Sequence, residues 1–390
     1  MKKHIGLIVT KPPVYSEQFL MDKIQGLIDS GYTVTLFSNA YVPNKTPFKV
    51  VYALSPQPKF KVGIKLLYYI LLGIINLNKL FRYYNISLKQ GNSNKKTFKY
   101  LISNYHILIS KIDWLHFEFS GLAYNREYVA KAIGCKMSLS IRGYDIAISP
   151  LKNDKVHSKV WKFVDKVHSI SDDITELAYQ NGMPNAITIQ KISPAIKPET
   201  FPLKGDCGTV KNPIKLISVG RLHWKKGYNY ILLALKELKN QNIDFIYSII
   251  GEGKAKEELV YISNMLGIEK QVIFHGEVKH ASIAEHLHQS DIFIQFSVQE
   301  GFSNAVLEAQ SCGLMVIGSD AEGLPENINN GETGWIVGKR DYIALSEQIK
   351  NIAKMNSDER KKIGAAASER VSKHFDLTKQ NKEFDEFYSE

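Results

Sequence analysis

The chain has 390 residues, of which 44% are hydrophobic and 23% are charged, and its formal net charge is +11. This length exceeds what one hydrophobic core normally organises, so we expect two globular domains, and the composition excludes a disordered or collagen-like chain. The three cysteines are widely spaced and argue against a disulfide framework or a cysteine metal site, which favours a reducing, cytoplasmic setting.

The chain opens with the pattern of a parallel β-α-β unit. An apolar strand at Ile5–Val9 is followed by a helix at Glu17–Ser30 and a second strand at Gly31–Phe37. The first apolar run is too short for the core of a secretory signal, so we expect it to be a buried strand.

A long stretch without acidic residues follows this unit. Residues 30–112 contain twelve Lys/Arg and no Asp/Glu, and residues 1–205 as a whole carry 28 Lys/Arg against 13 Asp/Glu. A single surface lysine means little, but a span of this length favours a negatively charged partner, either an anionic membrane surface or nucleic acid. The apolar run Leu66–Ile75 is too short to cross a bilayer, so it is either a helix buried in the first domain or one that dips into a membrane interface.

Further elements complete two α/β halves. The first half, residues 1–200 with a basic apolar insertion at about 60–100, adds strands at Trp114–Phe117, Lys136–Ile141, Lys166–Ser169 and Ala186–Ile189. Residues 193–213 lack hydrophobic periodicity and are rich in proline and glycine, which predicts a linker. The second half, residues 201–371, has strands at Ile214–Val219, Asp244–Ile250, Val272–His275, Asp291–Ser297 and Leu314–Gly318. Strands that alternate with helices indicate a doubly wound parallel sheet, and residues 372–390 end the chain with an amphipathic helix.

A basic loop follows the first strand of the second half. Gly220 and Arg221 come directly after that strand, and Lys225, Lys226 and Gly227 follow. Ligands bind beyond the carboxyl ends of the strands in open α/β sheets, so these cations suit a diphosphate whose oxygens gain charge when it leaves. Taken alone, such a loop is more often merely solvent-facing, and its interpretation depends on what lies beside it.

An acidic segment reaches the same sheet edge. Glu300 follows the strand that ends at Ser297, and the turn after it leads into a helix that runs to Cys312. The first amides of a helix lack intrahelical partners and can hold an anion. Two glutamates on a surface helix normally form salt bridges, but Glu300 precedes the helix, where it can accept hydrogen bonds from sugar hydroxyls. Glu308, within the helix, can take the two hydroxyls of a ribose.

The residues do not indicate a metal or a dinucleotide. Gly251-Glu252-Gly253 begins like a dinucleotide fingerprint, but Lys256 stands where the third glycine belongs. No His/Asp/Glu set has metal spacing, so we expect no metal cofactor if Arg221 and Lys226 replace the cation.

Residues 214–340 resemble the nucleotide-binding domain of glycosyltransferase family 4, whose members are retaining enzymes of the GT-B fold. The matching segments are Ser218-Val219-Gly220-Arg221-Leu222, Lys226-Gly227, Ile250-Gly251-Glu252-Gly253, Phe274-His275-Gly276-Glu277-Val278, Glu300-Gly301-Phe302-Ser303-Asn304, Glu308-Ala309, Gly323-Leu324-Pro325-Glu326 and Gly331-Glu332-Thr333-Gly334. The resemblance implies two Rossmann-like, doubly wound domains that face a cleft, with the final helix crossing back to pack on the first domain.

The same resemblance implies a role for each matching residue. Arg221 and Lys226 would hold the diphosphate, Glu300 would bind the donor sugar, and these three form the expected catalytic set. The expected donor-binding residues are Gly220, Glu277, Val278, Gly301, Phe302, Ser303, Asn304 and Glu308, with Glu308 on the ribose and the backbone near Glu277 facing the base.

The first half resembles the family more loosely. Ser16-Glu17-Gln18-Phe19 matches an opening seen in polysaccharide-assembly members, and His116 matches a histidine at a strand end. Arg142-Gly143-Tyr144-Asp145 resembles a motif that often begins with histidine, so the arginine here rules out a catalytic histidine at position 142. We expect His116, Arg142 and Asp145 to contact the sugar or the acceptor.

Together these features predict a retaining glycosyltransferase that moves a sugar from a nucleoside diphosphate, UDP rather than GDP, to a glycan. The basic first half suggests a lipid-linked acceptor and a peripheral position at the cytoplasmic face of the membrane. Two alternatives stay open: a GT-B-fold sugar-nucleotide epimerase, and a protein whose basic half binds nucleic acid. The basic span has only one arginine, Arg82, and no glycine-aromatic binding motif, so we expect no nucleic-acid partner.

Overall fold

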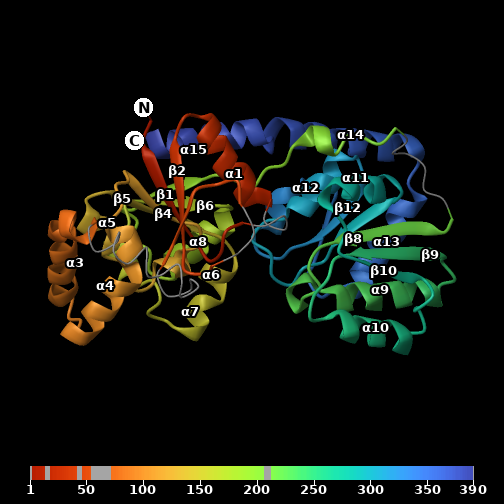
Figure 1. The fold of residues 1–390 in the computed structure, drawn as a ribbon. Coiled ribbons are helices and arrows are strands. Elements are labelled where there is room, and N and C mark those ends of the chain that lie inside the picture. The colour runs from red at the N-terminus through yellow and green to blue at the C-terminus, as the bar shows by residue number, and fades with distance from the viewer. Residues whose placement is uncertain (1, 14–17, 42–45, 54–71, 206–211, 390) are drawn as a thin grey trace. The chain divides into compact units, whose positions relative to one another are not determined.

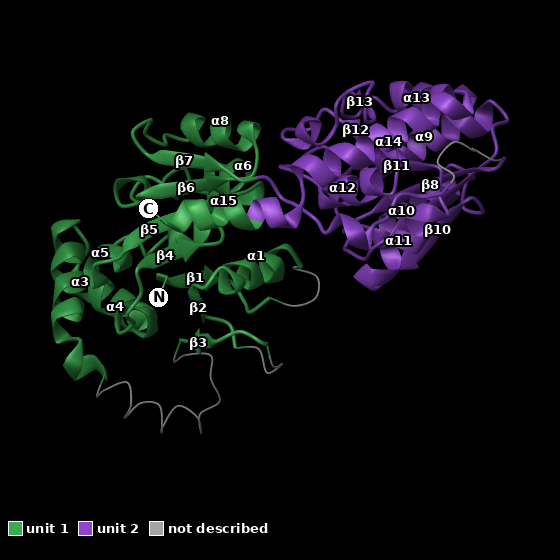
Figure 2. Ribbon diagram, turned by 90° about the horizontal axis from the view of Figure 1, so that it is seen from above, with its two compact units in different colours: residues 1–192, 381–390 green, residues 193–380 purple. Residues whose placement is uncertain are grey.

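Two separate parallel sheets organise the chain in a computed structural model that describes residues 2–13, 18–41, 46–53, 72–205 and 212–389 (Figure 1). Unit 1 comprises residues 1–192 and 381–390, and unit 2 comprises residues 193–380 (Figure 2). Glu17, Cys207 and residues 66–71 of the predicted apolar helix lie outside the described residues.

The unit boundaries differ from those predicted at residues 200 and 371. Ile196 and Asp376 form a parallel bridge, in which the amide of Ile196 donates to the carbonyl oxygen of Phe375 at 3.0 Å. This bridge joins the outgoing and the returning chain within unit 2. The first boundary therefore falls before residue 196, and the chain returns to unit 1 only after residue 380.

Unit 1 is built on a seven-stranded sheet in the order β3-β2-β1-β4-β5-β6-β7, with every pair parallel. Its strands are β1 (His4–Val9), β2 (Thr33–Ser38), β3 (Val50–Tyr52), β4 (Trp114–Phe117), β5 (Lys136–Ile141), β6 (Lys166–Ser169) and β7 (Thr188–Lys191). Its helices are α1 (Gln18–Asp29), α3 (Leu77–Lys89), α4 (Asn94–Leu108), α5 (Val129–Ile133), α6 (Tyr144–Ala147), α7 (Ser149–Lys152), α8 (Asp172–Gln180) and most of α15 (Leu377–Ser389).

One face of this sheet packs on α1 and α15. Ile5 and Leu7 of β1 join Ile24 of α1 and Phe387 of α15 in one buried cluster. The spacing of Phe384, Phe387 and Tyr388 that predicted an amphipathic final helix is explained by this contact, since all three side chains are buried. The final helix therefore completes the core of unit 1.

Unit 2 is built on a six-stranded sheet in the order β10-β9-β8-β11-β12-β13, again parallel throughout. Its strands are β8 (Ile214–Val219), β9 (Phe245–Ile250), β10 (Val272–Gly276), β11 (Ile292–Gln295), β12 (Met315–Ser319) and β13 (Trp335–Val337). Its helices are α9 (Tyr228–Asn240), α10 (Lys256–Met265), α11 (His280–His288), α12 (Asn304–Ser311), α13 (Tyr342–Lys354) and α14 (Ser357–His374). α9 and α13 pack on each other and share the main hydrophobic cluster with the sheet.

The sequence predicted most of these strands to within a residue or two. It missed β3 and β13, which are short and lie at the edges of the two sheets. Both consist largely of half-buried residues, so neither shows the continuous apolar run of a central parallel strand.

The described end of the predicted apolar helix lies at the surface. The side chains of Ile74 and Ile75 are 60% and 78% exposed, whereas Gly73 is buried against Tyr105. Within the part of the chain that the structure describes, no helix is long and apolar enough to span a membrane.

Candidate functional site

The basic and the acidic loop of unit 2 meet at the carboxyl edge of its sheet. The ammonium of Lys226 is paired with Oε2 of Glu300, and the backbone amide of Val298 donates to the carbonyl oxygen of Lys225 at 2.7 Å. Ser297 donates to the same carboxylate oxygen at 3.1 Å. The prediction that these loops lie side by side is confirmed, and Glu300 is held by a cation and a hydroxyl.

Glycines allow these loops to approach each other closely. Gly227 has a φ of 64°, and a Cβ added there would lie 2.1 Å from the carbonyl oxygen of Phe296. Gly251 has a φ of 137°, and its added Cβ would lie 2.1 Å from the carbonyl oxygen of Gly220. A side chain at Gly227 would push the basic loop away from the end of β11, so the pairing of Lys226 with Glu300 depends on this glycine, whereas Gly251 lets the loop after β9 approach Gly220.

Gly220 and Arg221 lie at the head of the basic loop. A Cβ added at Gly220 would be 3.9 Å from the Nζ of Lys226, so the ammonium lies close to this backbone. Arg221 is exposed, and Tyr228 fixes the loop by donating to the carbonyl oxygen of Gly220 at 3.0 Å. Lys226 of this loop is thus held by Glu300, whereas Arg221 faces solvent.

The entry to α12 differs in detail from the prediction. Ser303 occupies the N-cap position, but its side chain makes no capping hydrogen bond. Its backbone amide donates to Oδ1 of Asn327 at 3.0 Å, and Nδ2 of Asn327 returns a bond to the carbonyl oxygen of Ser303 at 3.0 Å. The amide of Ser303 is therefore occupied by a side chain, which leaves the preceding Gly301 and Phe302 as the backbone next to Glu300.

Glu308 is buried in α12 and faces α11. Its Oε1 lies 2.9 Å from Nε2 of His280, and only 6% of the residue is exposed. Glu277 is exposed and Val278 half-buried just after β10, at the same edge of the sheet as the residues that follow β8 and β11. Asn304 is half-buried in the first turn of α12.

Three residues of this edge escaped the sequence analysis. They are His280, which holds Glu308, Asn327, which fixes the start of α12, and Gln299. The side chain of Gln299 is 8% exposed, and neither its nitrogen nor its oxygen has a partner among the described residues. Asn327 directly follows the matched segment Gly323–Glu326, Gln299 directly precedes Glu300, and His280 lies two positions after Val278, so adjacency to matched segments was the available sequence signal.

The residues predicted on unit 1 lie in a buried polar network. Lys23 of α1 pairs with Glu118 at 2.7 Å, and Nε2 of His116 lies 3.0 Å from the Nζ of Lys23. Lys23 is 2% exposed, whereas His116 and Glu118 have no exposed surface. Burial lowers the pKa of Lys23 to about 8, although the neighbouring Glu118 raises it. Burial is also the main reason why the pKa of His116 lies well below 6.5, and the charge of Lys23 lowers it further. His116 is a neutral interior group, which corrects the prediction that it contacts sugar.

Asp145 is also structural, whereas Arg142 is partly accessible. The two oxygens of Asp145 accept from the amide of Arg142 at 3.0 Å and from the amide and hydroxyl of Ser120 at 3.0 and 2.9 Å. Asp145 is 4% exposed, so it ties together the loops after β4 and β5 and does not reach outward, contrary to the prediction. The guanidinium of Arg142 lies 4.4 Å from the ring centre of Phe19 and 3.5 Å from Glu118.

The described residues contain no group of three or more His, Cys, Asp or Glu side chains arranged to hold a metal ion.

Comparison with known proteins gives matches to the second half and to the whole chain. Residues 203–370 match the model of a family described as "Glycosyl transferases group 1". WcaL of Escherichia coli strain K12, named for colanic acid biosynthesis, is 29% identical over 177 residues, which is 44% of either chain. The chain therefore matches less than half the length of WcaL. AmsK of Erwinia amylovora, named as an amylovoran biosynthesis glycosyltransferase, is 27% identical over 89% of either chain.

Solved structures agree over almost the full length. A glycosyltransferase from Rickettsia africae is similar with a TM-score of 0.72 and 20% identity, covering 99% of this chain and 98% of the other. HepE of Anabaena, solved with UDP and glucose, has a TM-score of 0.73 and 18% identity, with 99% of each chain covered. The fold predicted from the sequence, two Rossmann-like α/β domains of the GT-B type, is confirmed.

Proposed function

Since residues 203–370 form a group 1 glycosyl transferase domain, we propose that the chain is a retaining glycosyltransferase of cell-surface polysaccharide synthesis. It would move a sugar from a nucleoside diphosphate, with UDP preferred over GDP, to a glycan acceptor. The observation that carries the proposal is the contact between Lys226 and Glu300 at the carboxyl edge of the sheet. This contact puts a cation for phosphate next to a carboxylate for sugar hydroxyls. The choice of UDP is supported by HepE, which is solved with UDP and glucose.

The reaction would use charge and position rather than a protein nucleophile. The bond between the sugar C1 and the diphosphate oxygen breaks, and an acceptor oxygen bonds to C1 on the face that the diphosphate leaves. The acceptor proton passes to the departing diphosphate. Arg221 and Lys226 offset the charge that develops on its oxygens, so the proposal requires no metal, and Glu300 orients the sugar.

The nucleoside would lie along the neighbouring strand ends. Glu308, held by His280, is proposed to accept hydrogen bonds from the two ribose hydroxyls. The backbone near Glu277 and Val278 would face the base. The unpaired amide of Gln299, adjacent to Glu300 in sequence, is a further candidate to contact the donor sugar.

The donor site is tested by thermal unfolding with nucleotide sugars and by transfer assays. A donor at one hundred times its Kd should stabilise the wild-type protein by about 2.7 kcal/mol. We expect Glu300→Gln and Lys226→Ala to abolish transfer while the protein stays folded. Lys256→Ala is the matched control, because Lys256 is exposed and pairs with Glu252. Wild-type turnover in either site variant would refute these roles, and conversion of the donor sugar without any acceptor would indicate an epimerase.

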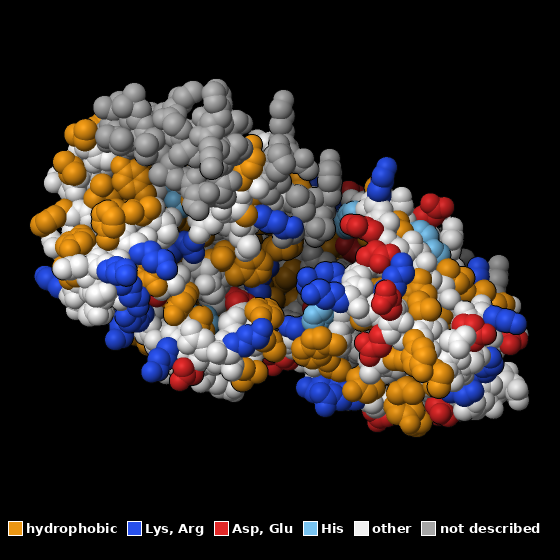
Figure 3. Space-filling model, turned by 60° about the horizontal axis from the view of Figure 1, so that its bottom comes forward, with side chains coloured by type: hydrophobic (Ala, Val, Ile, Leu, Met, Phe, Trp, Pro, Cys, Tyr) orange, Lys and Arg blue, Asp and Glu red, His pale blue; other side chains and the backbone are white. Residues whose placement is uncertain are grey.

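We also propose that unit 1 binds the anionic cytoplasmic face of a membrane, where a lipid-linked acceptor would be met. Its segment 72–75 and its helices α3 and α4 expose six apolar side chains, Ile74, Ile75, Leu77, Phe81, Phe98 and Ile102, all at least half exposed. α3 and α4 pack on each other, and exposed basic residues are interspersed, namely Arg82, Lys89, Lys95, Lys96 and Lys99. Figure 3 shows hydrophobic and Lys/Arg side chains next to one another on the surface of unit 1. Apolar groups surrounded by cations suit an interface with acidic headgroups.

Vesicle sedimentation tests this surface. Wild-type protein should bind vesicles that contain phosphatidylglycerol and not vesicles of phosphatidylcholine alone. Replacing Phe81 and Phe98 with serine should weaken binding at least tenfold, because each buried aromatic contributes roughly 1.5–3 kcal/mol. Met265→Ser on unit 2 is the control, since Met265 is 66% exposed and Phe81 is 68% exposed. Equal binding by the double variant, or a preference for duplex DNA over vesicles, would contradict the proposal.

A further inference from the structure

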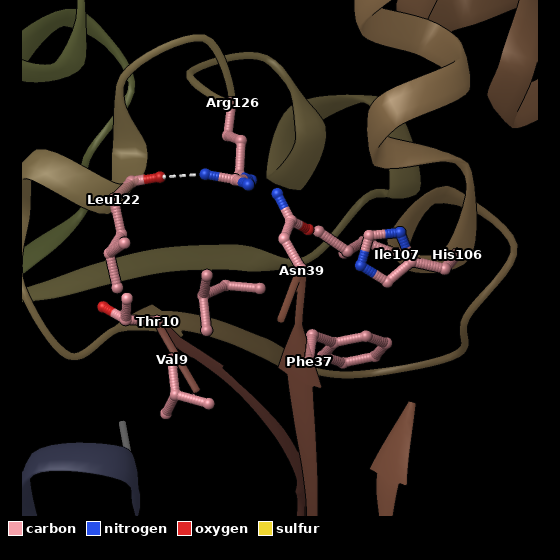
Figure 4. Close-up of a pocket in the computed structure, with 9 residues that line it drawn as sticks. Val9, Thr10, Phe37, Asn39, His106, Ile107, Leu122 and Arg126 are labelled. Carbon is pink, nitrogen blue, oxygen red and sulfur yellow. Dashed lines mark hydrogen bonds between the residues drawn. The ribbon is translucent and has the colours of Figure 1, made fainter. Parts of the chain in front are cut away.

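A cavity of about 180 Å³ opens beyond the carboxyl ends of β1 and β2 in unit 1 (Figure 4). Its walls come from Val9 at the end of β1 and Thr10 after it, Asn39 after β2, and Leu122 and Arg126 in the segment after β4. After β1, the strands β2 and β3 are added on one side of it and the strands from β4 onward on its other side, so the strand order reverses at β1. Such a switch point is where open α/β sheets form a crevice for ligands. The cavity has room for about six water molecules at roughly 30 Å³ each.

The wall of this cavity contains a charged side chain, Arg126, that forms no ion pair with the described residues. Arg126 NH1 donates to the carbonyl oxygen of Leu122 at 2.8 Å, whereas its Nε is buried without a partner among the described residues. The neighbouring Glu127 acts on Arg126 through its charge but makes no hydrogen bond to it, and it accepts from the amide of Asn125 at 3.0 Å. A guanidinium keeps its charge and has five N–H donors, so the buried Nε of this half-buried side chain remains available to a ligand with negative charge.

A second buried group points to the same ligand chemistry. His106, at the end of α4, lines the cavity, is 3% exposed, and its Nε2 has no partner among the described residues. Figure 4 shows the guanidinium of Arg126 and the side-chain amide of Asn39 reaching toward the same space, with the ring of His106 beside them. Each of these three side chains can donate an N–H, and none of the described residues that line the cavity is acidic. Buried polar atoms are normally satisfied, so these two atoms in one cavity call for a partner that the described residues do not supply.

We propose that this cavity binds an anionic group, a phosphate or a carboxylate, carried by the acceptor. The guanidinium of Arg126 provides the charge and a charge-assisted hydrogen bond, and His106 and Asn39 provide neutral donors. The carrier would be either a lipid-linked diphosphate or a uronic acid of the glycan, because each brings one of these groups. The identification of the carrier as the acceptor rests on the proposed function, whereas the anion site itself does not.

The experiment measures anion binding by titration calorimetry on the full chain, in buffers free of phosphate and sulfate. Saturating UDP is present throughout, so that the cations of unit 2 are occupied. The probes are inorganic pyrophosphate and glucuronate. We expect at least one probe to bind, and Arg126→Met to weaken that binding about tenfold to a hundredfold, the range of a hydrogen bond to a charged group. Lys155→Met removes a charge from an exposed position of unit 1 outside the cavity and should leave the affinity unchanged.

Two further measurements separate ligand binding from a structural role. His106→Leu removes one donor without changing the charge and should weaken the same probe several-fold. In the absence of anions, Arg126→Met should melt no lower than the wild type, because the guanidinium donates to the carbonyl oxygen of Leu122 and makes no ion pair with the described residues, while its Nε is buried without a partner among them. A lower melting temperature would show that the arginine supports the fold.

Each probe result has one meaning. Binding of pyrophosphate alone identifies a phosphate carrier, and binding of glucuronate alone identifies a carboxylate carrier. Failure of both probes, or equal affinity in Arg126→Met, would overturn the anion site. The UDP-induced thermal shift reports the donor site of unit 2 separately. Failure of the anion site therefore does not refute the donor site, and failure of the donor site does not refute the anion site.

Discussion

Replacing His106 with leucine is expected to reduce the loss of unfolding free energy that unit 1 suffers at acid pH. The imidazole is 3% exposed, and its ring centre lies 6.0 Å from that of Phe37. Burial, with a further contribution from Arg126, lowers the pKa of His106 from 6.5 to about 3. The ring is therefore neutral in the folded protein over the whole range in which an unfolded histidine takes up its proton.

The sign and the size follow from this difference in pKa. Well above pH 6.5 the imidazole is neutral in both states and contributes no pH dependence. Below that pH the unfolded chain binds a proton that the folded chain does not, so acid favours unfolding. At pH 5 the unfolded group is 1.5 units below its pKa, and at about 1.36 kcal/mol per unit the cost is about 2 kcal/mol. The cost continues to grow until the pH reaches about 3.

Urea unfolding at pH 7 and pH 5 measures this term. Trp224 and Trp335 are replaced with phenylalanine, so that the fluorescence of Trp114 and Trp161 reports unit 1 alone. Between pH 7 and pH 5, the free energy of unfolding of the chain that keeps His106 should fall by about 2 kcal/mol more than that of the His106→Leu variant. The other buried histidines are present in both chains and cancel. Equal losses in the two chains would show that His106 is not held neutral by burial.

Two further substitutions test the backbone and the buried ion pair. Gly227→Ala should cost about 1–3 kcal/mol more than Gly267→Ala in thermal unfolding of unit 2. Both glycines have φ near 65°, but only at Gly227 would the Cβ meet the carbonyl oxygen of Phe296, and equal costs would contradict this clash. Lys23→Met should destabilise unit 1 by about 3 kcal/mol because it leaves Glu118 buried without its closest cation, and adding Glu118→Leu should restore most of the loss. If the double variant is no more stable than Lys23→Met alone, the cost does not come from the stranded carboxylate.

The central strands and the chemistry at their ends were accessible to sequence reasoning. β4, β5, β6 and β8 were placed to the residue, and of these β4 and β8 are the mostly apolar runs expected of strands buried on both faces of a parallel sheet. Residues that follow such strands must lie at the carboxyl edge. Lys226 and Glu300 could therefore be assigned to one site although 74 positions separate them.

The interior of unit 1 was not accessible in this way. His116 and Asp145 follow or end strands just as Glu300 does, yet both are buried and held by other side chains. Whether a polar group at a strand end faces outward depends on what packs over it. His116 is covered by α15, a helix far along the chain, and the ring centre of Tyr388 lies 5.7 Å from that of His116.

The sequence by itself determined the two parallel sheets, their approximate limits and the charged residues at the edge of the second sheet, because local hydrophobic patterns and strand ends fix these. Only the tertiary structure decided which polar groups are paired. Lys23 pairs with Glu118 across 95 positions, whereas the buried Nε of Arg126 has no hydrogen-bond partner among the described residues, and this difference identifies the cavity beside it as a candidate ligand site. Burial and pairing depend on segments distant in the chain, and no local pattern records which of those segments meet.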